Sequence, residues 1–322
     1  MRNIGKIKET VLDRSVVKPI EQNKVGITGA SIGLDCAFFG ENGIATGYVA
    51  YNDSKASQHT IIQACNNLWA QGIEPKIITL SISMPDSFRE IKLKEIMKQA
   101  CDTAKMQGVS IAGGHTEFVK DLAYPIISVT ALGQKVHTFE SPQGIEGFDI
   151  VMTKWMALSG TSIIARQERE KLIEKLPAYY VDEAASLDQF VDISKEAQIA
   201  YETGGVISMH DVAGGGIFTA LWEICKNLGC GCEVGLEKIP VLQETIEVSE
   251  FFDINPYRLR GDGSLLIITS NGDELVQKLK SNEINACIIG RTNATIDKTI
   301  VREDEIRFLE PGNGDELYSA LN

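Results

Sequence analysis

The segment from Gly108 to Gly133, GVSIAGGHTEFVKDLAYPIISVTALG, constrains the fold of this 322-residue chain more than any other. Two apolar runs that are typical of buried strands flank its centre, GGHTE at residues 113–117, which we expect to form a turn. Because glycines lack a Cβ, a ligand can closely approach the backbone N–H groups of such a turn. The segment therefore predicts a polar binding turn between two strands.

Two further segments combine glycines with a carboxylate. Residues 26–35, GITGASIGLD, end at Asp35, and residues 210–216, HDVAGGG, carry Asp211. The glycines at 214–216 open a predicted helix, whose N-terminal N–H groups would face the Asp211 turn. Three such segments, far apart in sequence, are what a chain needs to fold carboxylates around a metal-bound polyphosphate.

The charge balance limits which phosphates the chain can bind. Lysine and arginine number 31 against 44 aspartates and glutamates, which gives a net charge of −13 and a pI near 4.9. A general nucleic-acid binder is excluded because it needs a basic stripe, so a bound phosphate must come with a metal or with backbone donors. Apolar runs such as 77–84 are far shorter than the roughly 20 residues of a membrane helix, and the first residues lack a signal-peptide core. We therefore expect a cytoplasmic protein with neither a nucleic-acid nor a membrane partner.

Length and pattern predict two domains, because 322 residues exceed what one hydrophobic core usually holds. Residues 134–148 have prolines and glycines but no periodicity, so we place the N-terminal domain at 1–135 and the C-terminal domain at 136–322. Periodicity in the first domain predicts strands at 44–51, 77–84, 109–112 and 125–133, and helices at 58–71 and 93–104. In the second it predicts strands at 149–154, 206–209, 264–269 and 285–290, with short strands near the end, and helices at 159–176, 182–202, 242–252 and 273–281. A further helix is opened by the glycines at 214–216 and carries Leu221, Ile224, Cys225 and Leu228 on one side.

Several polar residues have a structural as well as a functional interpretation. Asp211 could cap the following helix, although the two companion segments favour a ligand role. His115 and His210 could be general bases or structural hydrogen-bond partners. Lys154, at a strand end, could hold phosphate or remain solvated at the surface.

Two residue pairs are equally open. Asn66-Asn67 lie midway along a predicted helix, either on an exposed face or on a polar face turned to a ligand. Cys230-Gly231-Cys232 could bind a metal, but no second pair has ligand spacing, which favours free thiols.

The order of these motifs resembles the superfamily of aminoimidazole ribonucleotide (AIR) synthetase, HypE, selenophosphate synthetase and thiamine monophosphate kinase. The family pattern is a glycine-rich segment leading to an acid, a helix with Asn-Asp before a Gly-x-x-Pro turn, a Gly-Gly/Asp-x-Thr turn, and an Asp-x-x-Gly-Gly-Gly type turn. The counterparts here are Gly33-Leu34-Asp35, Asn66-Asn67 before Gly72-Ile73-Glu74-Pro75, GGHTE, and residues 210–216. The resemblance covers nearly the whole chain and is greatest to HypE-like proteins.

The resemblance implies a two-domain α+β fold of mixed α/β layers, with an N-terminal ATP-binding domain whose sheet dimerises into a β-barrel. It implies a homodimer, a maturation-protein partner as in hydrogenase maturation, and ATP with Mg²⁺ as cofactors. The implied reaction is of the phosphotransferase type: an oxygen of a small amide- or carbamoyl-type substrate is phosphorylated and so activated.

The residues assigned by this reading fall into three sets. The catalytic set is His115, Asp211 and Lys154. The nucleotide-binding set is Gly33, Asp35, Asn67, Gly113, Gly114, His115, Thr116, Glu117, Gly214 and Gly215. The magnesium set is Asp35, Glu117 and Asp211.

The chain also departs from the family pattern. Asn67 replaces the aspartate of the helix, and residues 44–48 lack the further aspartate of the strand. Since Mg²⁺ favours carboxylates, a second function stays open, a nucleotide-binding scaffold or assembly protein with weak or no turnover. HypE acts on a cysteine at its own C-terminus, whereas this chain ends YSALN, so we expect no such reaction in cis.

Overall fold

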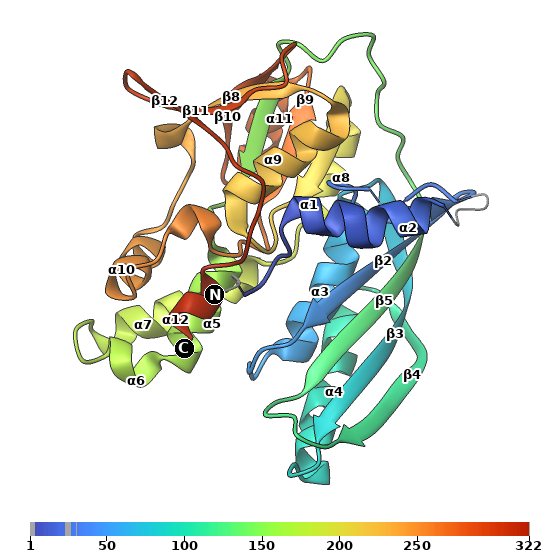
Figure 1. Ribbon diagram of the computed structural model, residues 1–322, viewed down its shortest axis with the longest axis vertical. Coiled ribbons are helices and arrows are strands. Elements are labelled where there is room, and N and C mark those ends of the chain that lie inside the picture. The colour runs from blue at the N-terminus through green and yellow to red at the C-terminus, as the bar shows by residue number, and fades with distance from the viewer. Residues whose placement is uncertain (1–3, 23–26, 30, 322) are drawn as a thin grey trace. The chain divides into compact units, whose positions relative to one another are not determined.

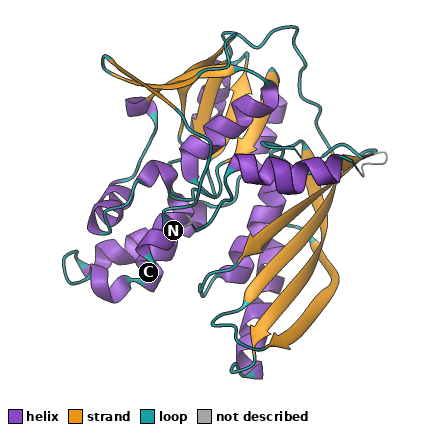
Figure 2. Ribbon diagram, viewed as in Figure 1, coloured by secondary structure: helices purple, strands orange, loops and turns teal. Residues whose placement is uncertain are grey.

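The computed structural model describes residues 4–22, 27–29 and 31–321. The chain divides into two compact units, a smaller one of residues 26–29 and 35–138 and a larger one of residues 1–25, 30–34 and 139–322. Both units combine helices with a sheet, so the fold is a two-domain α+β fold (Figure 2). Gly26 and Ala30 of the predicted glycine-rich segment lie outside the described residues. Within the described ranges, no helix has the length and apolar character needed to span a membrane.

The smaller unit is a five-stranded sheet with two helices (Figure 1). Its elements are β1 (Ala37–Phe39), β2 (Asn42–Val49), α3 (Ala56–Trp69), β3 (Ile73–Pro85), α4 (Glu90–Met106), β4 (Ser110–Val119) and β5 (Ile126–Lys135). The strand order is β1-β2-β5-β3-β4, with β3 and β4 parallel and the other neighbours antiparallel. The sheet is open in the described part of the chain, with β1 and β4 at its edges, so no closed barrel is formed there.

The core of the smaller unit lies between the sheet and α3. Along β5, Ile127, Val129 and Ala131 are fully buried, whereas the residues between them are partly exposed, as expected when one face of a sheet is covered. The helix approaches β2 so closely that a Cβ at Gly47 would lie 2.2 Å from the carbonyl oxygen of Thr60. Position 47 therefore accepts no side chain, an aspartate included.

The predicted GGHTE turn is wrong, because these residues belong to the edge strand β4. Gly113 to Glu117 pair in parallel with Thr79 to Ser83 of β3. The register shifts between Ile78 and Thr79, and the two glycines take φ values of 146° and 154° beside this bulge. A Cβ at Gly114 would lie 1.7 Å from the carbonyl oxygen of Leu80. The glycines thus allow close strand pairing, and they do not form a loop.

The larger unit contains the remaining elements. Its strands are β6 (Asp149–Thr153), β7 (Val206–Asp211), β8 (Gly231–Gly235), β9 (Leu265–Thr269), β10 (Ala286–Asn293), β11 (Lys298–Arg302) and β12 (Glu305–Phe308). Its α-helices are α1 (Glu9–Leu12), α2 (Lys18–Glu21), α5 (Leu158–Gln167), α6 (Arg169–Leu172), α7 (Ala178–Ala185), α8 (Ser194–Thr203), α9 (Gly216–Leu228), α10 (Gln243–Phe251), α11 (Gly272–Ser281) and α12 (Leu317–Ala320). The π-helical turn η1 (Asp13–Val17) joins α1 to α2, and the 3₁₀ turns are η2 (Leu187–Phe190), η3 (Leu236–Lys238) and η4 (Pro256–Arg258).

Its seven strands form one mixed sheet in the order β12-β11-β8-β10-β6-β9-β7. Strands β7 and β9 are buried along their whole length, so both faces of the sheet are covered there. Helix α9 packs on β7, β8 and β11. Helices α8 and α11 pack on each other, α8 on β7 and β9 and α11 on β6 and β10. The buried end of β7 is therefore held by its pairing with β9 and by the helices that cover it.

Two long helices predicted in this unit are divided in the structure. The predicted helix at 159–176 is α5 and α6, and that at 182–202 is broken by η2 and by Asp192, whose carboxylate accepts a hydrogen bond from the N–H of Ser194 at 2.8 Å. Such a local side-chain bond competes with helix continuation. Strand β8 was not predicted, because its short sequence GCEVG has no clear alternation.

Candidate functional site

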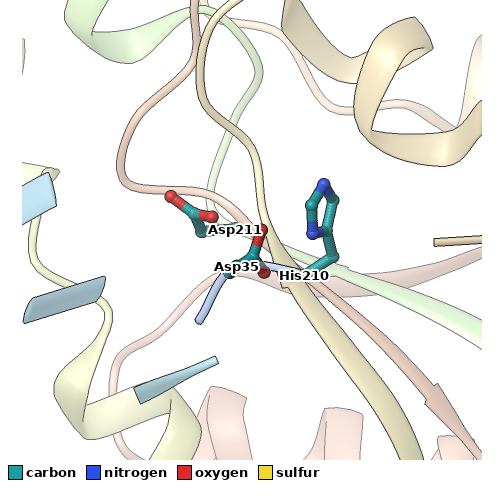
Figure 3. A group of neighbouring side chains, drawn as sticks. All are labelled: Asp35, His210 and Asp211. Atoms are coloured by element: carbon teal, nitrogen blue, oxygen red, sulfur yellow. The ribbon is translucent and has the colours of Figure 1, made fainter. Parts of the chain in front are cut away.

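The C-terminal end of β7 presents two buried polar side chains in succession, His210 and Asp211. They retain only 4% and 3% of their surface exposed. Antiparallel pairing with Leu266 and Leu265 of β9 fixes both backbones. The two side chains leave the backbone in different directions, yet a ring nitrogen of His210 and a carboxylate oxygen of Asp211 lie within 4.8 Å of each other (Figure 3). The strand end thus holds a nitrogen and an oxygen donor side by side.

His210 is held by a charged pair on α9 and the N-terminal segment. Its Nε2 lies 3.2 Å from Oε2 of Glu223, and the ammonium of Lys6 donates to the same oxygen at 2.6 Å. Burial opposes ionisation of Glu223, but the hydrogen bond to His210 and the charge of Lys6 outweigh it and lower the pKa of Glu223 from 4.5 to about 2. The carboxylate is therefore charged at neutral pH and fixes the orientation of the imidazole ring.

The glycine segment after Asp211 turns the chain from β7 into α9. The helix begins at Gly216, its N-cap is Gly215 in the left-handed region with φ 81°, and no side chain caps it. The interpretation of Asp211 as a helix N-cap is therefore wrong. The N–H of Gly215 donates to Asp315 of the C-terminal segment at 2.8 Å, and burial raises the pKa of that carboxyl group.

A second loop supports the glycine segment. The N–H of Gly261 donates to the carbonyl of Ala213 at 3.3 Å. On either side of Gly261, the buried guanidinium of Arg260 donates two hydrogen bonds to Asp262, at 2.9 and 3.2 Å. Asp262 also accepts a hydrogen bond of 2.5 Å from Ser159 of α5. The Gly261–Ser264 loop therefore fixes the backbone around the glycine segment.

Lys154 follows β6, and its side chain is almost fully buried. Its ammonium lies 2.6 Å from Glu196 and donates to the carbonyls of Phe190 and Asp192 at 2.9 and 2.5 Å. These three acceptors match the three donors of an ammonium group. The structure thus places Lys154 among the residues that order the segment between η2 and α8, and its surroundings do not resemble the solvated surface that was the alternative.

In the smaller unit, β4 presents three polar side chains to solvent, those of His115, Thr116 and Glu117. His115 Nε2 lies 3.6 Å from Glu117 Oε2, with 69% and 55% of the two side chains exposed. They lie on the same face of the edge strand, because side chains two residues apart share a face. In the isolated chain these groups are open to solvent.

The remaining predicted ligands have hydrogen-bond or packing partners. Gln71 donates to Asp35 at 3.3 Å, and Asn67 of α3 donates to the carbonyl of Thr46 at 3.2 Å. Asn66 is fully buried, so an exposed helix face is wrong for it. Gly33 belongs to the larger unit, where its Cβ position would lie 2.2 Å from the carbonyl oxygen of Glu223, so close packing on α9 requires a glycine there.

The larger unit also contains a cavity that sequence reasoning missed. It has a volume of about 730 Å³ and lies at the first turn of α9, with Gly215 and Thr219 in its wall. Phe218 and Tyr257 line it as a stacked pair with ring centroids 4.9 Å apart, and Arg258 lies beside them. The C-terminal segment 307–319 supplies much of the remaining wall. No local sequence pattern indicates it, because its walls come from segments far apart in the chain.

Three buried cysteines meet at the C-terminal end of α9, again through tertiary contacts. The thiol of Cys225 is hydrogen bonded to those of Cys230 and Cys232, and these bonds, together with burial, raise its pKa. Cys230 follows Gly229, the left-handed residue that ends the helix, and its N–H donates to the carbonyl of Cys225 at 3.0 Å. This backbone hydrogen bond is typical of a helix C-terminus, where two side chains also pack across the end of the helix. Packing at the end of α9 therefore explains the contact between Cys225 and Cys230.

Comparison with known proteins identifies two consecutive domain families. The model of the AIR synthase related protein N-terminal domain matches residues 13–134, and that of the AIR synthase related protein C-terminal domain matches residues 147–302. Together they cover most of the chain, including Asp35, the β4 residues and Asp211.

Two curated relatives illustrate the similarity in sequence. Phosphoribosylformylglycinamidine synthase subunit PurL of Methanocaldococcus jannaschii is 26% identical over 211 residues, which are 62% of this chain and 27% of that protein. Carbamoyl dehydratase HypE of Cupriavidus necator is 24% identical over 216 residues, 65% of this chain and 58% of that protein. In both cases the match covers less than two thirds of the relative's length.

Solved structures share the fold. The hydrogenase maturation protein HypE in complex with ATP superposes with a TM-score of 0.72 at 15% identity, covering 98% of this chain and 94% of that one. A chain of the HypE–HypF complex superposes with a TM-score of 0.73 at 18% identity, covering 92% of this chain and 99% of that one. At these identities the likeness concerns the fold.

Proposed function

Because the chain belongs to the AIR synthase related family, we propose that it is an ATP-dependent enzyme that phosphorylates, and thereby activates, an oxygen of a small amide- or carbamoyl-type substrate. One observation carries the proposal: β7 delivers a buried acid, Asp211, directly before the glycine segment that opens α9. An anion is stabilised at a helix N-terminus, and a carboxylate beside it can hold a cation. HypE, named as a carbamoyl dehydratase and solved with ATP, supports this choice at the level of the family.

The roles follow from the chemistry of each group. We assign Mg²⁺ binding to Asp35, Glu117 and Asp211, because hard cations favour carboxylates. Asn67 and the backbone of residues 113–117 complete the nucleotide site by analogy with the family pattern, and His115 is the proposed proton carrier. The chain would supply mainly positioning and charge neutralisation, which dominate phosphoryl transfer.

The cavity at the first turn of α9 is our proposed place for the acceptor substrate. It adjoins the glycine segment through Gly215 and combines stacked aromatic rings with the guanidinium of Arg258. Planar amide and carbamoyl groups pack well on aromatic rings, and an arginine can donate two hydrogen bonds to an acyl or carboxylate oxygen. A substrate held here would lie beside the N-terminus of α9.

We also propose a homodimer and a maturation-protein partner. In the isolated chain β4 is an edge strand exposed along nearly its whole length, and unpaired edges are usually covered in native assemblies. A second copy that covered β4 would bury His115 and Glu117 and so reduce their exposure to water. The likeness to a chain of the HypE–HypF complex favours a maturation-protein partner.

A scaffold that binds nucleotide with weak or no turnover is the second candidate. Two features of the smaller unit favour it: Asn67 has an amide where the family has an acid, and residues 44–48 of β2 contain no aspartate. Both reduce the negative charge available to a magnesium ion. The two candidates differ in whether an acceptor stimulates ATP cleavage.

The deciding experiment measures ADP formation with Mg²⁺, with and without a panel of primary amides, ureas and carbamates. The enzyme predicts stimulation by at least one class, and ³¹P NMR should show ¹⁸O from that labelled acceptor in the phosphate released. The matched control is Asp211→Asn, which keeps the shape of the side chain and removes its charge. Nucleotide binding with no stimulation by any class would favour the scaffold, and stimulation that persists in Asp211→Asn would contradict our site.

A further inference from the structure

The pair at the end of β7 contains a nitrogen donor, and this bears on which cation it prefers. A ring nitrogen of His210 and a carboxylate oxygen of Asp211 lie within 4.8 Å of each other, a separation that one bound ion can span with modest adjustment (Figure 3). Magnesium requires oxygen ligands and keeps several waters, whereas imidazole suits first-row transition ions such as iron, cobalt and zinc. The imidazole nitrogen therefore offers a transition ion a ligand that Mg²⁺ would not use, while the carboxylate of Asp211 can serve either ion.

The surroundings of His210 select which ring nitrogen offers a lone pair. Glu223 Oε2 lies 3.2 Å from Nε2 of His210, so Nε2 can donate its proton to this carboxylate, which also accepts a hydrogen bond from the ammonium of Lys6. When Nε2 carries the ring proton, the lone pair is on Nδ1, the ring nitrogen that is closer along the side chain to the backbone of β7. A histidine that donates its other N–H to a carboxylate is the usual arrangement around metal-binding histidines.

Rigidity of the pair adds to this argument. Both residues are almost fully buried on a strand that is paired to β9, and Glu223 is fixed on the packed helix α9. Lys6 completes the arrangement from the N-terminal segment, before the first residue matched by the family. Ligands held in this way lose little entropy when an ion binds.

We propose that His210 Nδ1 and Asp211 bind a first-row transition divalent cation of the Fe²⁺, Co²⁺ or Zn²⁺ class, with Glu223 and Lys6 as positioning residues. The inference rests on the proposed function in that it concerns a cation of the same site, additional to the magnesium that accompanies ATP. It makes Glu223 a residue that acts through His210 and not on the substrate.

The test uses Co²⁺ as the probe with nucleotide-free protein, followed by its d–d absorption and by paramagnetic proton NMR. We expect at least a tenfold lower Kd for Co²⁺ than for Mg²⁺, and one shifted exchangeable proton, the Nε2–H of His210, that disappears in D₂O. His210→Gln should remove this signal and weaken Co²⁺ binding about 10- to 100-fold while changing Mg²⁺ binding less than threefold. Glu223→Gln should weaken Co²⁺ binding about tenfold with the d–d bands retained.

Equal affinity for the two ions would overturn the inference, and so would Co²⁺ binding accompanied by a thiolate charge-transfer band and no shifted N–H proton. Circular dichroism of His210→Gln separates loss of the ligand from loss of the fold. Binding of ATP with Mg²⁺ is measured separately. If it persists when Co²⁺ selectivity is absent, only this inference fails; if Co²⁺ binds through His210 and ATP does not bind, only the proposed function fails.

Discussion

At position 67 the local structure favours an amide side chain, whereas the proposed function favours a carboxylate. Its side-chain amide donates to the carbonyl of Thr46, a bond that a carboxylate could not make. We predict that Asn67→Asp lowers the free energy of unfolding by about 1 kcal/mol without ligand. In the presence of Mg²⁺ the same change should raise ATP affinity roughly tenfold, which corresponds to about 1.4 kcal/mol of added interaction.

Urea unfolding and titration calorimetry on the same preparation test the two halves of this prediction. The conservative control is Asn67→Gln, which keeps a donor and adds no charge. If Asn67→Asp binds ATP no more tightly than the wild type at saturating Mg²⁺, this position does not face the nucleotide's cation.

The sequence predicted those residues of the candidate site that belong to a local pattern, and not those that join it by tertiary contacts. Asp211 and the glycines after it follow an apolar run, so their place at a strand end was readable. Their partners were not, because Lys6, Glu223 and Asp315 come from distant segments and meet the site only through tertiary packing. Lys154 shows the same limit, since nothing near it in sequence indicates that Glu196 would bury its charge.

At the scale of elements, β4 depends on two glycines with different requirements. Gly113 and Gly114 both have φ values that other residues avoid, at 146° and 154°. A Cβ at Gly114 would lie 1.7 Å from the carbonyl oxygen of Leu80, whereas a Cβ at Gly113 would meet nothing within 4 Å. We predict that Gly114→Ala destabilises the smaller unit by at least about 4 kcal/mol, and Gly113→Ala by about 1–2 kcal/mol.

Thermal and urea unfolding of the two alanine variants measure this difference, and each serves as the control for the other. Equal losses of stability would show that backbone strain alone matters and that the close pairing of β3 with β4 does not. A smaller loss for Gly114→Ala than for Gly113→Ala would contradict the strand register.

The C-terminal segment gives a pH-dependent prediction at the start of α9. Burial raises the pKa of Asp315 above its usual 3.8, although Arg260 and the backbone donors at Leu317 and Gly215 oppose the shift. A raised folded-state pKa means that its stabilising contribution is complete below pH 3.8 and is lost as pH rises through the folded-state pKa. We predict that Asp315→Asn removes this loss of stability with rising pH.

Urea unfolding of the wild type and Asp315→Asn at several pH values above 3.8 tests this directly. The asparagine places an NH₂ group against a backbone donor, so a constant destabilisation is expected at every pH. The difference between the two proteins should therefore shift in favour of the variant as pH rises. A difference that does not change with pH would show that Asp315 is ionised throughout.

Most elements were readable from periodicity, and the failures have local causes. Helices α3, α4, α9 and α11 and the core strands carry regular apolar spacing and were predicted. Strand β4 was predicted only at its start, because paired glycines read as a turn when the neighbouring strand is unknown. The helical spacing of apolar residues between 182 and 202 hid the break at Asp192, whose carboxylate accepts a hydrogen bond from the N–H of Ser194.

At the scale of the molecule, two units with separate sheets each hold part of the predicted site. Asp35, Asn67 and the β4 residues belong to the smaller unit, whereas Asp211 and the glycine segment belong to the larger. A ligand bound by both sets would stabilise both units together, since a ligand that binds only the native state raises its stability. The change that ATP causes in the unfolding temperature therefore tests both parts of the predicted site together.

The most direct test is a thermal-shift titration with ATP, with and without Mg²⁺, on the wild type and Asp211→Asn. We predict that the wild type melts at a higher temperature with ATP and Mg²⁺, by the amount that RT ln(1 + [L]/Kd) gives, and that metal removal with EDTA abolishes the rise. Asp211→Asn should fold and show little or no rise. No shift of the wild type at millimolar ATP, or an equal shift in Asp211→Asn, would contradict the proposed nucleotide site.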